Sequence, residues 1–179
     1  MGADVVALLA ARHGGKLKRS RLDRSLVDTV RVGSRQLALA FPQTYMNDSG
    51  LAVAPLVRRF GLADAEDADL TRLVIVHDEL DLPVGVLRVK VGGGLAGHNG
   101  LKSIKAHLHS DGFTRVRIGI GKPPGKKEGV DHVLKRPGKR DRDELAVMVE
   151  RAADAVELIL TDGPAAAQNQ YNRTDPDPA

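Results

Sequence analysis

Apolar residues recur along this chain with two spacings, which separate predicted helices from predicted strands. The spacing of an amphipathic helix occurs at residues 3–12, 49–60, 99–109, 143–160 and 164–171. Apolar runs or strict alternation, typical of strands, occur at residues 27–32, 36–41, 73–76, 86–91 and 116–120. Because the two kinds alternate without an internal repeat, the pattern predicts an α/β fold, a single domain over residues 1–171. Residues 172–179 are a polar tail that we expect to be disordered.

Turn and cap residues set the expected ends of several elements. The Gly-Ser pair at 33–34 separates two strand patterns by two residues, which is a β-hairpin signal. Asp48 or Ser49 can cap the helix that follows, and we expect Pro55 to kink this helix or to mark its first turn. The run at 73–76 is continuously apolar, which predicts a strand buried on both faces.

Composition excludes several classes of site. The 179 residues include no cysteine, which rules out disulfides, cysteine-ligated zinc, iron–sulfur clusters and a cysteine nucleophile within this sequence. No apolar run approaches the ~18–20 residues of a membrane span, and the start has no signal-peptide pattern. We therefore expect a soluble, cytoplasmic globular protein.

The formal net charge of +4 conceals two strongly basic segments. Residues 12–35 hold eight basic and two acidic residues, and residues 122–142 hold eight basic and three acidic residues. The rest of the chain is acidic. Such segments indicate either a polyanionic partner or two solvated loops. Because only 3% of the residues are aromatic, RNA would be bound through its phosphates rather than by base stacking.

Three polar clusters follow three predicted strands, at residues 42–47, 77–81 and 92–100. Ligands bind at the carboxyl ends of strands in α/β sheets. If these strands run parallel, their clusters would meet at one edge of the sheet and form a single site.

The cluster at 77–81 reads His-Asp-Glu-Leu-Asp. In an extended chain His77 and Glu79 lie on one face and Asp78 on the other. A carboxylate here can hold a histidine in the state that a general base needs, and a divalent metal is a rival interpretation. A third is a plain turn, in which Asp78 or Asp81 caps local N–H groups.

The cluster at 92–100 places five glycines around a His98-Asn99 pair at a helix start. It lacks the glycine spacing of a dinucleotide site and the lysine of a nucleotide-phosphate loop, so a generic nucleotide-binding protein is disfavoured. Its main chain can approach an anion or an oxyanion, or it is a flexible lid with Asn99 as a helix cap. Together with Asn47, His98 and Asn99 suit a carbonyl, a sugar or a base edge.

Nothing in the sequence marks a covalent nucleophile. Ser49 and Ser103 lie in helix-forming contexts, so a hydrolysis would use an activated water. We interpret His107, His109 and His132 as surface residues.

Together, residues 42–50, 75–83, 92–102 and 115–121 closely resemble the bacterial peptidyl-tRNA hydrolase family, and the likeness extends from residue 2 to about 171. The resemblance implies an α/β fold with a twisted mixed sheet flanked by helices. It also implies a cytoplasmic, metal-free and monomeric enzyme without a cofactor, whose partner is peptidyl-tRNA. The family hydrolyses the ester between the peptide and the 3′ ribose of tRNA.

The same resemblance implies roles for individual residues. Asn47 would hold the substrate near the scissile carbonyl, Asp78 would stabilise the protonated catalytic histidine, and Asn99 would position the water or the terminal nucleotide. The remaining residues would bind the tRNA: Tyr45, Met46 and His98 at its 3′ end, and Lys90 and Arg117 at its 5′ phosphate.

The resemblance also implies that the chain begins just after the family's first strand and its histidine-bearing turn, since His13 matches no catalytic position. On that expectation the chain as given lacks its general base and is crippled as an enzyme. The alternative is a catalytically inactive RNA-binding relative with the same fold.

Overall fold

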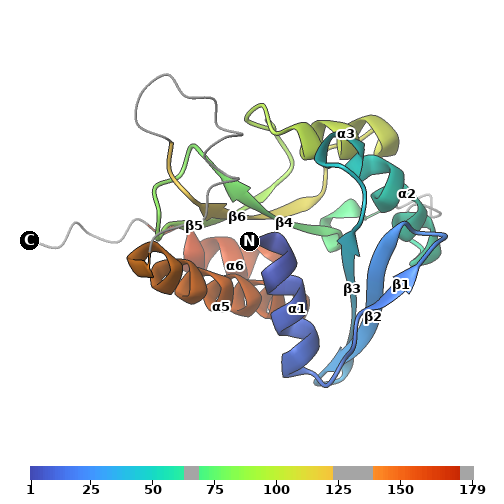
Figure 1. The fold of residues 1–179 in the computed structure, drawn as a ribbon, viewed down its shortest axis with the longest axis horizontal. Coiled ribbons are helices and arrows are strands. Elements are labelled where there is room, and N and C mark those ends of the chain that lie inside the picture. The colour runs from blue at the N-terminus through green and yellow to red at the C-terminus, as the bar shows by residue number, and fades with distance from the viewer. Residues whose placement is uncertain (63–68, 123–138, 174–179) are drawn as a thin grey trace, which may run out of the picture. The chain divides into compact units, whose positions relative to one another are not determined.

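The computed structural model describes residues 1–62, 69–122 and 139–173, and they divide into two compact units (Figure 1). The first unit comprises Met1–Val5, Val76–Lys90 and Val116–Ala179. The second unit comprises Val6–Ile75 and Val91–Arg115. The chain has the α/β architecture with mixed sheets and flanking helices that the sequence predicts.

The second unit contains an antiparallel sheet in the order β1-β2-β3. Its strands are β1 (Lys18–Ser20), β2 (Ser25–Val32) and β3 (Arg35–Pro42). The predicted hairpin is confirmed: Val32 pairs with Arg35, and Gly33 has a φ of +59°, which glycine adopts without strain. The strand β1 was not predicted, because its Lys-Arg-Ser sequence has no apolar alternation.

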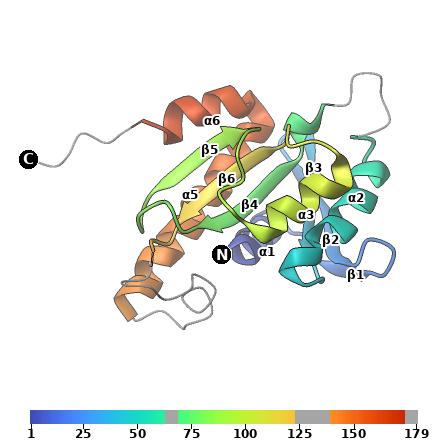
Figure 2. The same cartoon turned by 90° about the horizontal axis from the view of Figure 1, so that it is seen from above.

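Two helices of the second unit, α2 (Ser49–Arg59) and α3 (Asn99–Leu108), lie side by side (Figure 2). A short 3₁₀ turn, η1 (Met46–Asp48), precedes α2, and a second, η2 (Leu70–Arg72), precedes β4. Gly50 lets the helices approach closely, since its N–H donates to Ser103 Oγ at 3.0 Å. Pro55 lies inside α2, so it does not mark the first turn. The buried core of this unit is Val53, Val57, Leu101, Ile104 and Phe113.

The second sheet has the order β4-β6-β5, with β4 (Val74–Glu79), β5 (Leu87–Val91) and β6 (Thr114–Gly119). The strand β4 is parallel to β6, because Thr114 N–H donates to Leu73 O and Ile120 N–H to Glu79 O. The prediction that residues 73–76 are buried on both faces is wrong. The strand β4 lies at an edge of the sheet, and Val74, Ile75 and Val76 are only half-buried.

The strand β5 is antiparallel to β6, because Gly92 N–H donates to Phe113 O and Gly119 N–H to Val86 O. The carboxyl ends of β4 and β5 therefore lie at opposite ends of their sheet. The condition that all these strands run parallel is therefore not met, since β5 runs against β6.

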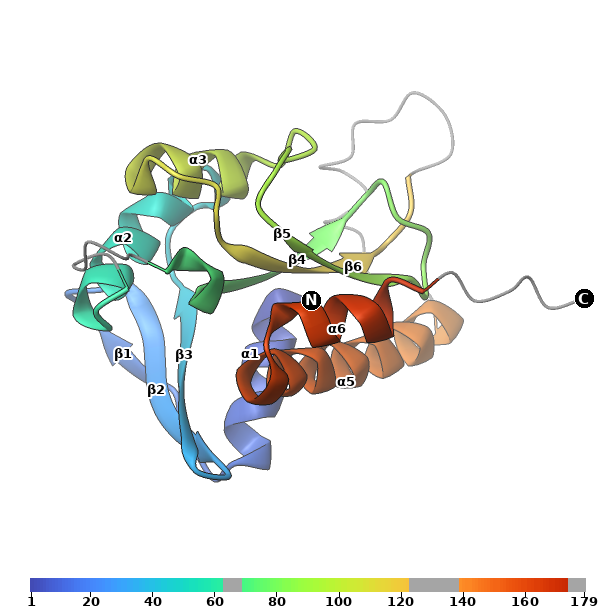
Figure 3. The ribbon, with the colours of Figure 1, turned by 180° about the vertical axis from the view of Figure 1, so that it is seen from behind.

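The first unit contains α5 (Lys139–Asp162) and α6 (Pro164–Tyr171), which pack against each other (Figure 3). The predicted apolar stripe of α5 is confirmed by the burial of Met148, Ala152, Val156 and Ile159. The first helix of the chain, α1 (Gly2–Arg12), begins with Gly2 against the carbonyl of Val76. Beyond α6, the Asn172 side chain pairs with both the N–H and the C=O of Val89, at 2.8 and 2.7 Å. This amide closes the outer edge of β5.

Several sequence predictions lie wholly or partly outside the described residues. These are most of the basic segment at 122–142, His132 and all but the first two residues of the predicted tail at 172–179. None of the helices in residues 1–62, 69–122 and 139–173 is long and apolar enough to cross a membrane.

Candidate functional site

The 3₁₀ turn η1 displays the first predicted site residues. Tyr45 is extended, with φ −62° and ψ 156°, and the chain then turns so that Asp48 N–H donates to Tyr45 O at 2.9 Å. Ser49 Oγ donates to Met46 O at 2.8 Å and fixes the same turn. Tyr45 is 83% exposed and Met46 57% exposed, and Asn47 between Met46 and Asp48 is exposed as well. The turn is thus held by its own main chain and presents its side chains to solvent.

The glycine cluster before α3 is anchored by Arg115, which is 1% exposed. Its guanidinium donates to the carbonyls of Gly94 at 2.9 Å and Gly93 at 3.3 Å, and also to that of Gly92. Gly92 and Gly93 have φ of +62° and +80°, which glycine adopts without strain because it has no Cβ. A buried arginine therefore sets the path of the loop that leads to His98.

The start of α3 is capped by His98, whose Nδ1 accepts from Leu101 N–H at 3.3 Å. The interpretation of Asn99 as the helix cap is therefore wrong; Asn99 is the first residue of α3, and it is exposed. Since the accepting Nδ1 carries no proton, the neutral ring is protonated at Nε2.

The fold brings η1 and the start of α3 into contact. A Cβ at Gly100 would lie 2.6 Å from Met46 Sδ and 3.1 Å from His98 Cε1, so only glycine fits there without movement. We call the side chains gathered on these two turns the turn region: Tyr45, Met46, Asn47, His98 and Asn99. It offers two neutral amides, which can donate to a carbonyl or accept from a hydroxyl or a water.

The end of β4, in the first unit, carries the His-Asp-Glu segment. His77 and Glu79 are buried, and Asp78 between them is half-buried. This alternation agrees with the expectation that His77 and Glu79 lie on one face of the strand and Asp78 on the other. His77 Nδ1 donates to the Asp78 carbonyl at 2.8 Å, because a carbonyl can only accept. This main-chain bond gives His77 a protonated Nδ1.

Arg117 is fixed by Glu79 in the same unit. Its Nε and Nη2 both donate to Glu79 Oε2 at 3.1 Å, and the two side chains are 19% and 6% exposed. The pairing of Val86 with Gly119 puts Arg88 opposite Arg117, and alternation along β5 puts the exposed Lys90 on the same side. We call Arg88, Lys90 and Arg117 the basic face.

A second ion pair lies beyond this carboxylate. Lys122 Nζ is 2.7 Å from Asp81 Oδ1, and their hydrogen bond holds the pKa of Asp81 below its usual range and raises the pKa of Lys122. Among the residues that the structure describes, no group of three or more histidine and carboxylate side chains could hold a metal ion.

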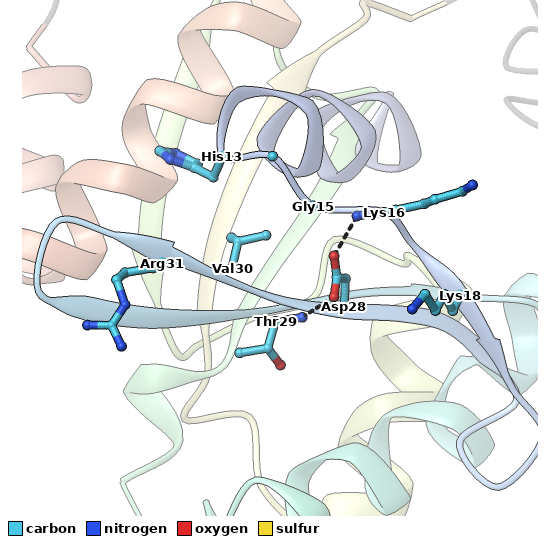
Figure 4. Close-up of a pocket in the computed structure, with 9 residues that line it drawn as sticks. His13, Gly15, Lys16, Lys18, Asp28, Thr29, Val30 and Arg31 are labelled. Atoms are coloured by element: carbon cyan, nitrogen blue, oxygen red, sulfur yellow. Dashed lines mark hydrogen bonds between the residues drawn. The ribbon is translucent and has the colours of Figure 1, made fainter.

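A hollow of about 360 Å³ lies between the end of α1 and β2 (Figure 4). Its cations do not converge: Lys16 and Lys18 extend to one side and Arg31 to the other. Asp28, between them, accepts from the N–H groups of Lys16 at 2.6 Å and Thr29 at 2.8 Å. None of the predicted site residues lines this hollow.

Sequence reasoning did not identify Glu79 as the partner of Arg117 or Arg115 as the anchor of the glycine loop. Alternation alone places Arg115 and Arg117 on one face of β6. The partner of each depends on which strands are neighbours, which the sequence does not display. His107 and His109 are exposed, as predicted.

These observations together define an α/β protein whose exposed amides lie on two adjoining turns. The family model described as "Peptidyl-tRNA hydrolase" matches residues 1–178. The chain belongs to this family.

Individual relatives are similar to this chain over most of their length. The peptidyl-tRNA hydrolase of Cutibacterium acnes is 44% identical over 182 residues, covering 96% of this chain and 88% of the relative. That of Mycobacterium tuberculosis is 43% identical over 172 residues, covering 96% and 87%. The crystal structure of the Acinetobacter baumannii enzyme has a TM-score of 0.83 at 33% identity, covering 96% and 84%.

Proposed function

We propose that this protein is a peptidyl-tRNA hydrolase that splits the ester between a peptide and the 3′ ribose of tRNA, acting in the cytoplasm as a monomer. The observation that carries this proposal, beyond family membership, is the contact of η1 with α3, which gathers two exposed amides on one part of the second unit. An ester has no charge before reaction, so neutral donors suit it, and charge develops on its oxygen only as water attacks.

Each residue of the turn region has a part in this reaction. The Asn47 amide donates to the scissile carbonyl, and the Asn99 amide orients the attacking water or the terminal nucleotide. Tyr45, Met46 and His98 line the site of the tRNA 3′ end. The positive end of the α3 dipole lies at Asn99 and favours the negative charge of the tetrahedral intermediate.

The proton that leaves the attacking water needs a general base. In the mechanism implied by the family resemblance this base is a histidine, and Asp78 stabilises its protonated form. Loss of a general base costs about 10²–10⁴ in rate, so weakening this base through Asp78 is expected to slow release of tRNA.

The basic face binds the 5′ phosphate of the tRNA. Glu79 occupies Nε and one N–H of Nη2 of Arg117, which leaves N–H groups of Nη1 and Nη2 for phosphate oxygens. Lys90 is diagonal to Arg117 on the neighbouring strand, a spacing of about 7–8 Å that long side chains bridge. Glu79 therefore acts as a positioning residue for Arg117.

Release of tRNA from N-acetylated aminoacyl-tRNA tests the proposal. Wild-type protein is expected to release tRNA, and its Asp78→Ala variant is expected to do so at least about 10²-fold more slowly. If the protein binds tRNA but releases none, the inactive RNA-binding relative is the better description.

A further inference from the structure

The three glycines that begin the loop before α3 turn their carbonyls toward one cation. Arg115 Nη1 donates to the Gly94 carbonyl at 2.9 Å. Its Nη2 donates to the Gly93 carbonyl at 3.3 Å and also to that of Gly92. Residues of an extended strand alternate between its two sides, so three consecutive carbonyls converge only where the chain turns, here through the positive φ of Gly92 and Gly93. A phosphate needs N–H donors, whereas these carbonyls can only accept, so this run of glycines is shaped to hold a guanidinium group.

Arg115 is a fixed anchor for this loop. It is 1% exposed, and Phe113 and Thr114, which precede it in the chain, are fully buried. Thr114 is bonded twice, since its N–H donates to the Leu73 carbonyl at 3.0 Å and its Oγ1 to the Thr71 carbonyl at 2.7 Å. Arginine stays charged in proteins, and a buried charge is tolerated only where it is paired or hydrogen-bonded. Arg115 and the loop carbonyls therefore stabilise each other's positions.

The stretch between the anchored glycines and the turn region is short and strained. Only Leu95, Ala96 and Gly97 separate these glycines from His98. Ala96 has a φ of +48°, a left-handed conformation that residues other than glycine rarely adopt. The turn closes where His98 N–H donates to the Leu95 carbonyl at 3.0 Å, and Leu95 packs against the buried core of the second unit. Strained backbone persists only where contacts on both sides fix the chain, and Arg115 provides those on the N-terminal side.

Resting on the proposed function, we propose that Arg115 is a positioning residue for the hydrolysis. By holding the glycine loop, Arg115 fixes the capping turn at His98 and with it Asn99, the first residue of α3, which orients the attacking water or the terminal nucleotide. A misplacement of about 1 Å can cost about 10²-fold in rate. Because Arg115 is buried, it acts through Asn99 and not on the substrate, so its replacement should lower kcat. The KM should change little, since the basic face binds the phosphate of the tRNA.

The alternative is that Arg115 contributes to stability alone. An Arg115 variant would then behave like any other core variant with the same loss of stability. Val57→Ala provides this comparison, because Val57 is 1% exposed and belongs to the buried core of the second unit but not to the glycine loop. This variant should lower the melting temperature, as loss of buried methyl groups does, without lowering kcat at temperatures where the protein is folded.

The first test needs no enzymatic activity. Arg115→Lys and Arg115→Met keep the aliphatic stem of the side chain, but lysine offers a single point charge and methionine offers no donor. In both variants, amide hydrogen exchange at His98 and Leu101 should become about tenfold faster or more relative to that at Gly50, because the turn and the helix cap open locally. The N–H of Gly50 donates to a serine farther along α3 and corrects for any general loss of stability. Val57→Ala should not accelerate His98 and Leu101 more than Gly50.

The second test is kinetic. With N-acetylated aminoacyl-tRNA, kcat should fall about tenfold in Arg115→Lys and about 10²-fold in Arg115→Met, with KM within about twofold of wild type. Two results would overturn the inference: exchange at His98 and Leu101 that only follows Gly50 in both variants, or faster exchange with kcat no lower than in Val57→Ala. If Arg115→Met does not fold, Arg115→Lys decides both tests. If wild type cleaves no substrate, the proposed function fails instead, and the exchange rates alone decide whether Arg115 positions the turn.

Discussion

The turn region and the basic face hold their polar groups in different ways. The turn region presents neutral amides at Asn47 and Asn99, on two turns that meet at Gly100. The basic face presents a cation, Arg117, whose direction is set by the buried carboxylate of Glu79. A neutral donor suits an ester and a fixed cation suits a phosphate. We therefore expect the turn region to govern the chemical step and the basic face to govern affinity for RNA.

The largest effect is expected from Asn47→Ala. Loss of a donor to the developing oxyanion should lower kcat by about 10²–10³-fold with little change in KM. Because the amide is neutral, the loss should be the same at low and high salt. Gln36→Ala, which removes an exposed amide from β3, is the control and should retain full activity. An equal fall in kcat in both variants would contradict a role for Asn47 in the reaction.

A smaller effect, of opposite kind, is expected from Arg117→Ala. The variant should raise KM about tenfold at moderate salt and leave kcat near wild type. The slope of log Kd against log salt concentration should fall by about one, the value for one lost phosphate contact. Substrate without a 5′ phosphate should bind both proteins alike. Arg72→Ala, at an exposed arginine of η2, is the control. If the 5′ phosphate makes no difference to the effect of Arg117→Ala, then Arg117 binds elsewhere on the RNA.

Gly100→Ala tests whether close packing sets the turn region. The added methyl must push Met46 aside, which should lower kcat about threefold to tenfold through the displaced turn. Met46 is exposed and alanine favours the helix, so the free energy of unfolding should change by about 1 kcal/mol or less. Gly94→Ala is the matched control, because a Cβ at Gly94 meets nothing within 4 Å. Equal activity losses in the two variants would contradict a role for packing at Gly100.

The smallest effect is expected from the exposed ion pair of Asp81 and Lys122. The lowered pKa of Asp81 means that its contribution to stability is present above its ordinary value of 3.8 and is lost as pH falls through the folded value. The raised pKa of Lys122 means that its contribution is present below 10.5 and is lost as pH rises through the folded value. Thermal unfolding of wild type and Lys122→Met should differ slightly near neutral pH and converge in strong acid. A difference that persists at low pH would show that the pair is not its source.

Local sequence signals predicted local structure well. The Gly-Ser turn at 33–34 forms the expected hairpin, and the apolar stripe of α5 is buried as predicted. The predictions that failed depend on contacts between distant segments. An apolar run such as 73–76 is typical of an interior strand, but the strand order puts β4 at an edge. The hydrogen bonds between β5 and β6 show in addition that these two strands are antiparallel.

In the candidate site, too, local motifs are visible in the sequence and contacts between distant segments are not. Motifs identify Asn47, Asp78 and Asn99 as candidates, since they need only sequence order. The partners that fix the site are not visible in those motifs. Glu79 meets Arg117 because β4 and β6 are neighbours, and Gly100 meets Met46 because η1 packs on α3.

Single-turnover cleavage of N-acetyl-aminoacyl-tRNA at saturating enzyme, with the Kd measured separately, distinguishes the chemical role of the turn region from the binding role of the basic face. Asn47→Ala is expected to slow cleavage about 10²-fold or more at an unchanged Kd, and Arg117→Ala to weaken binding about tenfold at an unchanged cleavage rate. A wild-type cleavage rate in Asn47→Ala, or slowed cleavage at full affinity in Arg117→Ala, would contradict these roles.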